Sequence, residues 1–292
     1  MSEKSIVERA VKDKFYEKKI LSLTDDDFCF ELNISNKERL LYRYRNISEY
    51  TLSDLLNDEI TFASPELFND PYDSSFIYKP KIKVSMKYEV RPNGGVATKG
   101  ESNKGKLAPA EERIIDNSLQ KFAKNLVRVA CFSEHNSNEV MWSHYASQAK
   151  GIVLSYSINQ LEELMKEHNI KDYVMTPIFY ENHKLFFNPI SKDTDEKKMM
   201  FYMNKVMLLK NKGWVYEDEW RLIFSTLNED RFSKKYVSLK GIKPIQIILG
   251  ENISPTYSRI IKDIARDKEI DLFQANTIQK SNTRKLQLER VY

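Results

Sequence analysis

Cysteine and histidine are scarce in this chain, whose 292 residues include 2 cysteines and 4 histidines. A secreted domain stabilised by disulfide bonds would need more cysteines than Cys29 and Cys131. The sequence therefore favours the reducing environment of the cytoplasm. The cysteines and histidines also lack the spacing of zinc ligands. We therefore expect neither a disulfide framework nor a bound metal.

Long apolar runs and a strong charge bias are missing as well. No stretch approaches the roughly 18 apolar residues that a membrane-spanning helix needs, so we expect no membrane partner. Residues 1–19 mix acids and bases, unlike a signal peptide. The net charge of +4 is too mild to require a nucleic-acid partner.

Apolar and aromatic residues are plentiful, at 41% and 12% of the chain, which indicates a globular protein with a sizeable core. Patterns typical of strands and helices intermix without the regular alternation of a doubly wound sheet. Several neighbouring strands have connections short enough for antiparallel pairing. We therefore predict an α+β fold with a mixed, largely antiparallel, split sheet and surrounding helices.

The expected domain organisation is an N-terminal helical extension, residues 1–38, followed by a single core domain, residues 39–292. The segment RPNGGVATKGESNKGK, residues 91–106, holds four of the eight glycines. This composition predicts a mobile insertion at about 79–108 within the core domain.

Helix signals mark three further segments of the core. A short helix is expected to begin with Thr51 or Ser53 as its N-cap. Another is expected over 138–150, and a long one over 195–212.

The stretch YRYR alternates two tyrosines with two arginines along an expected strand. Alternation puts Arg43 and Arg45 on one face, and Tyr42 and Tyr44 on the other. Two interpretations stay open for the arginines. They are either solvated side chains on an edge strand, or a fork that grips a phosphate or carboxylate through bidentate hydrogen bonds.

A second candidate stretch is FASPELFNDPYD. Ser64 ends an expected strand, where its hydroxyl can project from the sheet, and Asp70 lies in a turn rich in Asn, Asp and Pro. Turn chemistry alone can explain these residues. Because aromatic side chains flank the turn, it could also present its polar groups rigidly.

The third candidate is an aromatic face on the expected helix over 138–150. Trp142, Tyr145 and Ala146 recur at i, i+3 and i+4, so they share this face. Such a face usually belongs to the core. It could equally floor a pocket for a flat ring such as nicotinamide or adenine.

The fourth candidate, WVYEDEWRLIF, places three acids before an apolar strand. If the segment is extended, Glu217 and Glu219 share a face and Asp218 points away. In the plainer interpretation, Arg221 on the same face neutralises one carboxylate. Alternatively, Glu219 binds a hydroxyl or stabilises a cationic transition state, while Glu217 orients a nucleophile.

Six stretches, spread in order over roughly residues 40–255, resemble the bacterial domain of unknown function 2971 (DUF2971) family. They are LYRYR, ITFASPELFNDPYD, VACFSEHNSNEVMWSHYASQAKGIVLSYS, PIFYE, KGWVYEDEWRLI and IQIILGENIS. The resemblance implies a cytoplasmic bacterial protein. Some neighbours of the family are associated with abortive phage resistance, which implies a toxin or anti-phage defence effector.

The order of parts also resembles the arginine–serine–glutamate class of ADP-ribosyltransferases, which implies an ADP-ribosyltransferase-like fold. By that resemblance, Arg43 or Arg45 would grip the pyrophosphate of NAD, and Ser64 would support the arginine or the nicotinamide ribose. Glu219 would bind the ribose 2′-hydroxyl and stabilise the oxocarbenium ion, while Glu217 positions the acceptor. The other expected members of the NAD site are Tyr44, Asp70, Trp142 and Tyr145.

The function implied by this second resemblance is an NAD-consuming enzyme that modifies a macromolecule. NAD is its substrate, the acceptor is a protein or a nucleic acid, and a partner or antitoxin protein could accompany it.

Two other classes of function stay open. A metal-dependent nuclease would use four carboxylates to hold magnesium, namely Asp70, Asp73, Glu217 and Glu219. A non-catalytic sensor or interaction module would recognise its partner through residues 79–108 and aromatic surfaces.

Overall fold

The structure is a computed structural model that describes most of the chain from residue 38 onward. It describes residues 38–70, 72–78, 86–90, 96–101, 109–180, 185–187, 206–226, 232–280 and 283–291. The expected N-terminal helical extension lies outside these residues, apart from residue 38. Most of the expected insertion at 79–108 lies outside them too.

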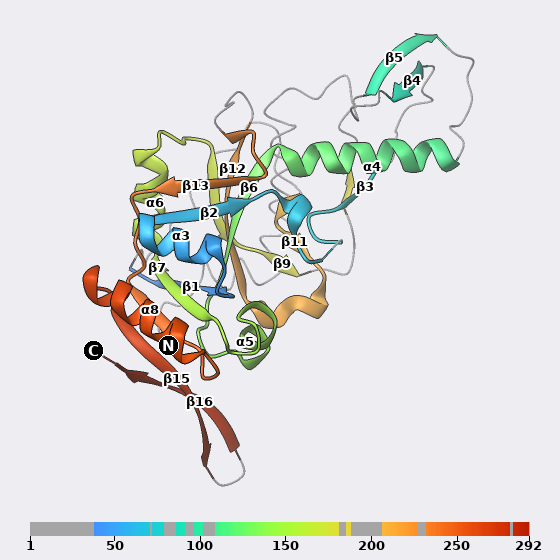
Figure 1. Cartoon of the computed structure of the whole chain (residues 1–292). Coiled ribbons are helices and arrows are strands. Elements are labelled where there is room, and N and C mark those ends of the chain that lie inside the picture. Colours follow the sequence, from blue (N-terminus) through green and yellow to red (C-terminus); the bar gives the residue numbers. More distant parts are fainter. Residues whose placement is uncertain are drawn as a thin grey trace, which may run out of the picture.

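The described residues build one ten-stranded sheet (Figure 1). Eight strands follow one another in it: β13 (Tyr236–Lys240), β2 (Glu59–Ala63), β6 (Val127–Ser133), β1 (Leu40–Arg45), β7 (Ile152–Ser157), β14 (Gln246–Leu249), β15 (Asp271–Lys280) and β16 (Thr283–Arg290). Two more extend it from β6, namely β12 (Glu219–Ser225) and then β8 (Tyr173–Pro177). Of the pairings described in this sheet, that of β14 with β15 is parallel and the others are antiparallel.

The sheet branches at β6, the strand that brings the candidate stretches together. Along one edge β6 pairs with β12 over its whole length. Along the other edge it pairs with β2 at Val129 and with β1 at Ser133. Since β1 and β2 share one edge of β6, they diverge from each other. The predicted α+β class, with a mixed and mostly antiparallel sheet, is confirmed.

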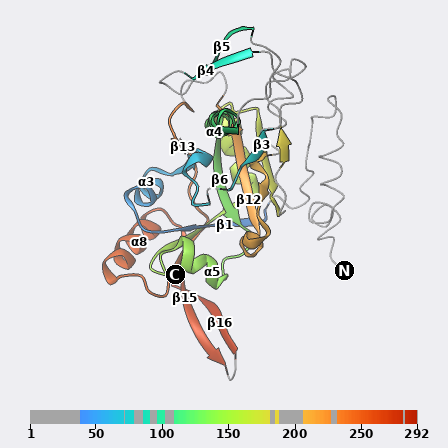
Figure 2. The same ribbon diagram turned by 90° about the vertical axis from the view of Figure 1, so that its right-hand side faces the viewer.

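Helices cover both faces of this sheet. On one face lie α3 (Glu49–Asn57), α6 (Ile158–Glu167) and α8 (Pro255–Asp267), whose apolar residues join the main core. On the other face lie α4 (Pro109–Asn125) and α5 (Glu139–Tyr145), whose apolar residues join two smaller clusters. In both views β15 and β16 form a hairpin that extends away from the helices (Figures 1 and 2).

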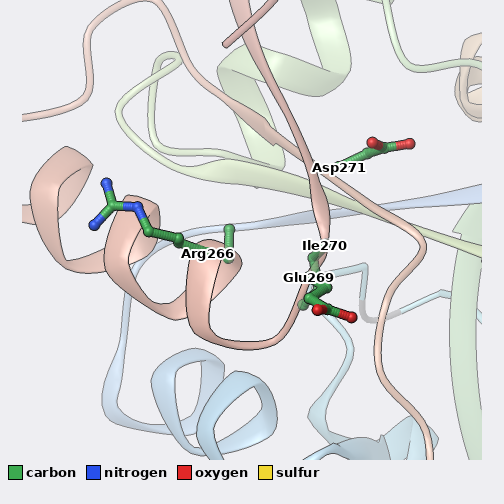
Figure 3. A pocket seen from close by; sticks show the side chains of 5 residues that line it. Arg266, Glu269, Ile270 and Asp271 are labelled. Carbon is green, nitrogen blue, oxygen red and sulfur yellow. The ribbon is translucent and has the colours of Figure 1, made fainter. Parts of the chain in front are cut away.

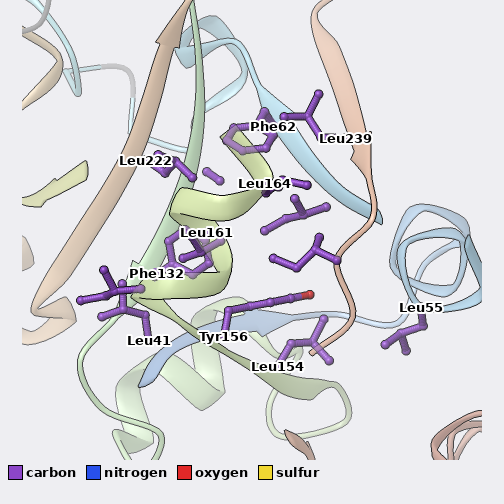
Figure 4. Close-up of a cluster of buried hydrophobic side chains, with 14 of the residues drawn as sticks. Leu41, Leu55, Phe62, Phe132, Leu154, Tyr156, Leu161, Leu164, Leu222 and Leu239 are labelled. Carbon is purple, nitrogen blue, oxygen red and sulfur yellow. The ribbon is translucent and has the colours of Figure 1, made fainter. Parts of the chain in front are cut away.

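The main core lies between the sheet and the first group of helices (Figure 4). Leu41 and Leu154 point into it from the sheet, and Leu55, Leu161 and Leu164 from the helices. Burying each such side chain contributes about 1.5–3 kcal/mol to stability. The core therefore fixes which face of every central strand is apolar, and hence which face its alternate residues occupy.

Short elements complete the described fold. They are the 3-10 helices η1 (Pro65–Leu67) and η2 (Lys212–Glu217), and three two-stranded ladders: β3 (Phe76–Tyr78) with β10 (Leu185–Phe187), β9 (Phe179–Tyr180) with β11 (Leu209–Lys210), and β4 (Met86–Val90) with β5 (Val96–Glu101). The ladders of β3 with β10 and β9 with β11 are parallel, and the third is antiparallel.

Three local predictions need correction. The N-cap of α3 is Ser48, whose hydroxyl accepts from the Thr51 amide, so neither Thr51 nor Ser53 is the cap. The helix expected to reach residue 150 ends at Tyr145, because residues 147–149 have positive φ. The expected long helix does not continue to 212, since its last residues form β11 and begin η2.

Candidate functional site

Glu217 and Glu219 come together through a turn of the backbone, not through the extended segment that we predicted. Glu217 ends η2, and β12 begins at Glu219. Asp218 between them has φ 40° and ψ 54°, a left-handed conformation that an aspartate tolerates better than most residues. As predicted, Asp218 points elsewhere, and its Oδ2 lies 3.2 Å from Nε2 of His135.

Lys210 joins the two glutamates. Its Nζ lies 2.5 Å from Oε2 of Glu217 and 3.0 Å from Oε2 of Glu219. The same nitrogen lies 3.6 Å from Oδ2 of Asp73, in the turn that follows η1. All four side chains are almost completely buried. Without the shared cation Lys210, the three buried carboxylates would repel one another at a high cost in stability.

Arg221, which is fully buried, anchors the same cluster from β12. Its guanidinium forms a bidentate ion pair with Asp73, with hydrogen bonds of 2.9 and 2.7 Å, and a second one with Glu219, with hydrogen bonds of 2.6 and 3.1 Å. Its Nη1 also donates to the carbonyl of Met207 and lies 3.2 Å from the hydroxyl of Ser74. Of the two interpretations left open for this stretch, the plainer one included this contact between a glutamate and Arg221. Every donor of this guanidinium has an acceptor.

We call these five residues, Asp73, Lys210, Glu217, Glu219 and Arg221, the ion cluster. It contains three carboxylates but only two cations, so it carries one surplus negative charge unless one carboxylate holds a proton. A buried cluster favours the neutral arrangement. One proton is therefore expected to reside on the least well paired carboxylate.

Glu217 is that carboxylate. Burial raises the pKa of Glu217 to about 7, against the opposing effect of Lys210. Burial would also raise the pKa of Glu219, but Arg221 and Lys210 outweigh burial and lower it to about 2. Two neighbouring carboxylates thus have opposite protonation behaviour near neutral pH, an arrangement that enzymes use for acid–base chemistry.

A chain of hydrogen bonds connects Glu217 to the surface. The hydroxyl of Tyr145, on α5, donates to Oε1 of Glu217 at 2.6 Å, and the exposed Asn69 amide donates to the same hydroxyl at 3.3 Å. Burial and the Glu217 charge raise the pKa of Tyr145, so it stays protonated. Both hydrogen bonds donate toward Glu217, so Tyr145 and Asn69 link this carboxylate to the surface and favour its ionised form.

Aromatic side chains surround this chain of hydrogen bonds. The Trp214 ring lies 5.1 Å from Nζ of Lys210 and 6.0 Å from the Tyr216 ring. The hydroxyl of Tyr216 lies 3.2 Å from Nδ1 of the exposed His144. With Tyr145 these residues form an aromatic rim around the buried glutamate.

The structure does not bring Arg43 and Arg45 to this rim. Tyr42 pairs with Ser133, and Ser133 pairs with Glu219, so these three residues face the same side of the sheet. Arg43 and Arg45, at the alternate positions of β1, face the other side, with Leu41 and the main core. The Nη2 atom of Arg43 donates to the Thr61 carbonyl at 2.6 Å.

Ser64 and Asp70 have contacts that secure local structure. The Ser64 hydroxyl caps η1 and donates to the Lys124 carbonyl at 3.0 Å. Oδ1 of Asp70 accepts from the Tyr72 amide at 2.8 Å, so this carboxylate shapes the turn that carries Asp73.

Of the two aromatic residues expected beside a flat ring, one is core and one is not. Trp142 is 2% exposed, and its ring packs edge-on against Tyr44 with centroids 5.4 Å apart. Tyr44 is buried too, and its hydroxyl donates to the His135 carbonyl. Tyr145 alone reaches Glu217.

The ion cluster leaves its carboxylates little capacity for a metal. No group of three or more His, Cys, Asp or Glu that could hold a metal ion occurs among the described residues. Lys210 and Arg221 bind Asp73, Glu217 and Glu219 directly. The described geometry thus offers no support for the nuclease alternative.

A surface hollow lies elsewhere, at the C-terminal end of α8 (Figure 3). Its charged residues include Arg266 and Asp271, which are paired with Asp263 and Arg290. None of the residues of the ion cluster lines it.

Sequence reasoning missed Lys210 and Tyr180. Lys210 follows an apolar run, VMLL, that suggested a helix, although a lone lysine at the end of such a run is itself a signal. Tyr180 is the strand partner of Lys210, and its hydroxyl accepts a hydrogen bond from the backbone amide of Glu219. The pairing of β9 with β11 was not predictable from either segment alone.

No helix among the described residues is both long and apolar enough to cross a membrane.

No curated protein and no solved structure matches the chain. Residues 141–222 match the family model described as Protein of unknown function (DUF2971). This stretch contains most of α5, Lys210 and both glutamates. For these residues the match supports the resemblance to the DUF2971 family.

Proposed function

We propose that the chain is an enzyme that uses Glu217 as its acid–base group in glycosyl transfer from NAD. One observation carries this proposal: the ion cluster has three carboxylates for two cations, and Glu217 is its exchangeable member. A group with a pKa near 7 populates both protonation states at neutral pH, which suits general acid–base catalysis.

The charge of the cluster fits a dissociative step. When Glu217 is ionised the cluster has a net charge of −1, which favours positive charge developing on a nearby ribose. As the bond between C1′ and the nicotinamide nitrogen breaks, nicotinamide leaves with the bonding electrons. A hydroxyl or amine of the acceptor then bonds to C1′, and its proton passes to Glu217, directly or through Tyr145.

The proposal gives Glu219 a different part from the one the resemblance implied. Its two oxygens already accept from two cations, Arg221 and Lys210, whereas Glu217 accepts from Lys210 alone of the two. We assign it a positioning role, in which it holds Lys210 beside Glu217. The nicotinamide ring would lie against the aromatic rim, where Tyr145 and Tyr216 offer flat surfaces.

The proposal assigns no role in NAD binding to Arg43 or Arg45, because they face the other side of the sheet. The ADP-ribosyltransferase-like fold, the macromolecular acceptor, a cytoplasmic toxin or anti-phage effector role and an antitoxin partner rest on the resemblances alone. We retain them as parts of the proposal.

The test is nicotinamide release from NAD in the presence of cell lysate, comparing wild type with Glu217→Gln. The amide keeps the shape of the side chain but cannot take up a proton. We expect a loss of at least 100-fold, typical of removing a general base. The matched control is Glu139→Gln, an exposed glutamate of α5, which should leave the rate unchanged.

Three outcomes would contradict the proposal. They are no release by the wild type in any lysate, equal release by Glu217→Gln, and an activity that a chelator abolishes. If Glu217→Gln instead keeps every cellular phenotype of the wild type, the chain acts as a non-catalytic module.

A further inference from the structure

The arginine at the end of β1, Arg45, lies in a second polar cluster on the face opposite Glu217. This cluster sits where β1 and β2 diverge, beneath α3, and includes Arg43, Asp54 and Thr61. A side chain at Gly151 would collide with the Arg45 carbonyl, so the backbone here is held in close contact with β7. The position of the Arg45 backbone is therefore well fixed.

Arg45 is poorly paired for an arginine in this position. Among the described residues its guanidinium has one ion pair, 3.8 Å from Asp54, and no hydrogen bond. Its Nε is buried without a partner. Oδ1 of Asp54 is engaged by the Thr61 hydroxyl at 2.5 Å. Unsatisfied donors at a buried site are costly, and their presence calls for an explanation.

The electrostatic setting adds to this deficit. Burial, and then the neighbouring Arg43, lower the pKa of Arg45 to about 10. Glu59, the other carboxylate close to Asp54, accepts from the Ser53 hydroxyl at 2.9 Å. An added anion would relieve the repulsion between the two guanidinium groups.

Two exposed tyrosines stack on each other here, at the start of α3 and of β13. Tyr50 of α3 and Tyr236 of β13 stack with ring centroids 5.4 Å apart and planes at 26°. They are 58% and 46% exposed, and Tyr236 is close enough to Arg45 to influence its pKa. The side chain of Arg45 itself is 21% exposed, so solvent reaches it.

We propose that Arg45 binds the phosphate of a small nucleotide whose base stacks on the outer face of Tyr236 in the pair that this ring forms with Tyr50. The planar guanidinium supplies the paired donors that a phosphate accepts. An aromatic surface stacks with any nucleobase. Because this site and Glu217 lie on opposite faces of the sheet, the proposal is independent of the proposed NAD chemistry.

The test is binding of AMP, ribose 5-phosphate and inorganic phosphate, measured by calorimetry at matched ionic strength. We expect AMP to bind about tenfold more tightly than ribose 5-phosphate, owing to stacking of its base. Arg45→Gln should weaken AMP binding at least tenfold. Tyr236→Ser should remove the preference for AMP over ribose 5-phosphate. The control Arg266→Gln changes an exposed arginine and should have no effect.

Arg45→Lys provides a second variant if the glutamine variant fails to fold. It keeps the positive charge but removes the paired N–H donors of the guanidinium. It too should weaken AMP binding. Unchanged AMP affinity in the folded Arg45 variants would overturn the proposal. So would equal affinity for AMP and ribose 5-phosphate, or no binding of any of the three by the wild type.

Discussion

Two arginines on opposite faces of one sheet, Arg221 and Arg45, differ in how completely they are paired. Arg221 is fully buried, and each of its N–H groups has an acceptor. Arg45 has a single ion pair of 3.8 Å and a buried Nε without a partner. Complete pairing indicates a side chain that holds other groups in place. The guanidinium of Arg45 makes no hydrogen bond among the described residues and its side chain is 21% exposed, so its Nη groups are available to a ligand.

The largest effect is expected on the well-paired side. Arg221→Met leaves Asp73 and Glu219 buried without their main counter-charge. Breaking a buried pair in this way costs about 3–5 kcal/mol of unfolding free energy. Urea denaturation measures it, with the exposed Arg266→Met as control. A loss below about 1 kcal/mol would show that the ion cluster is not the anchor described above.

The pH dependence of stability is the next largest effect. The pKa of Glu217 is raised from 4.5 to about 7, so folding is favoured while Glu217 holds its proton. This contribution is present below pH 4.5 and is lost as the pH rises through 7, by on the order of 1–3 kcal/mol. Denaturation at several pH values should show this slope in wild type, and its absence in Glu217→Gln would confirm the source.

A smaller effect is expected at Ser64. Ser64→Ala removes the cap of η1 and the hydrogen bond to the Lys124 carbonyl. The loss should be about 1 kcal/mol, with NAD chemistry unchanged. Thermal denaturation and nicotinamide release measure the two quantities. Loss of activity without loss of stability would instead favour the serine role implied by the ADP-ribosyltransferase resemblance.

The smallest effect on stability is expected at Arg45, in contrast to the large effect expected at Arg221. Arg45→Gln removes a poorly paired guanidinium and its repulsion with Arg43, so stability should change by less than about 1 kcal/mol. Denaturation of this variant beside Arg221→Met compares the two arginines directly. Equal losses in both variants would remove the distinction drawn between them.

The sequence predicted the chemistry of the ion cluster better than its geometry. The run of acids before an apolar strand pointed to Glu217, Glu219 and Arg221, and the plainer interpretation included the contact between a glutamate and Arg221. Local patterns did not predict the left-handed turn at Asp218 or the approach of Lys210. The position of Lys210 depends on the pairing of β9 with β11, which joins segments far apart in the chain.

Alternation along β1 correctly separated its arginines from its tyrosines. It could not show on which side of the sheet Glu219 lies, because that depends on the register of β1 and β12 with β6. A shift of one residue in either pairing reverses every side chain of a strand. For this reason the separation of arginines from tyrosines along β1 was predictable, whereas the assembly of one site from distant strands was not.

The central claim is that Glu217 carries the exchangeable proton of the ion cluster. The direct measurement is a pH titration of glutamate carboxyl carbons by NMR in isotopically labelled protein, with Glu217→Gln to assign the signal. We predict a midpoint near pH 7 for Glu217. A midpoint near the ordinary value of 4.5 would contradict the account.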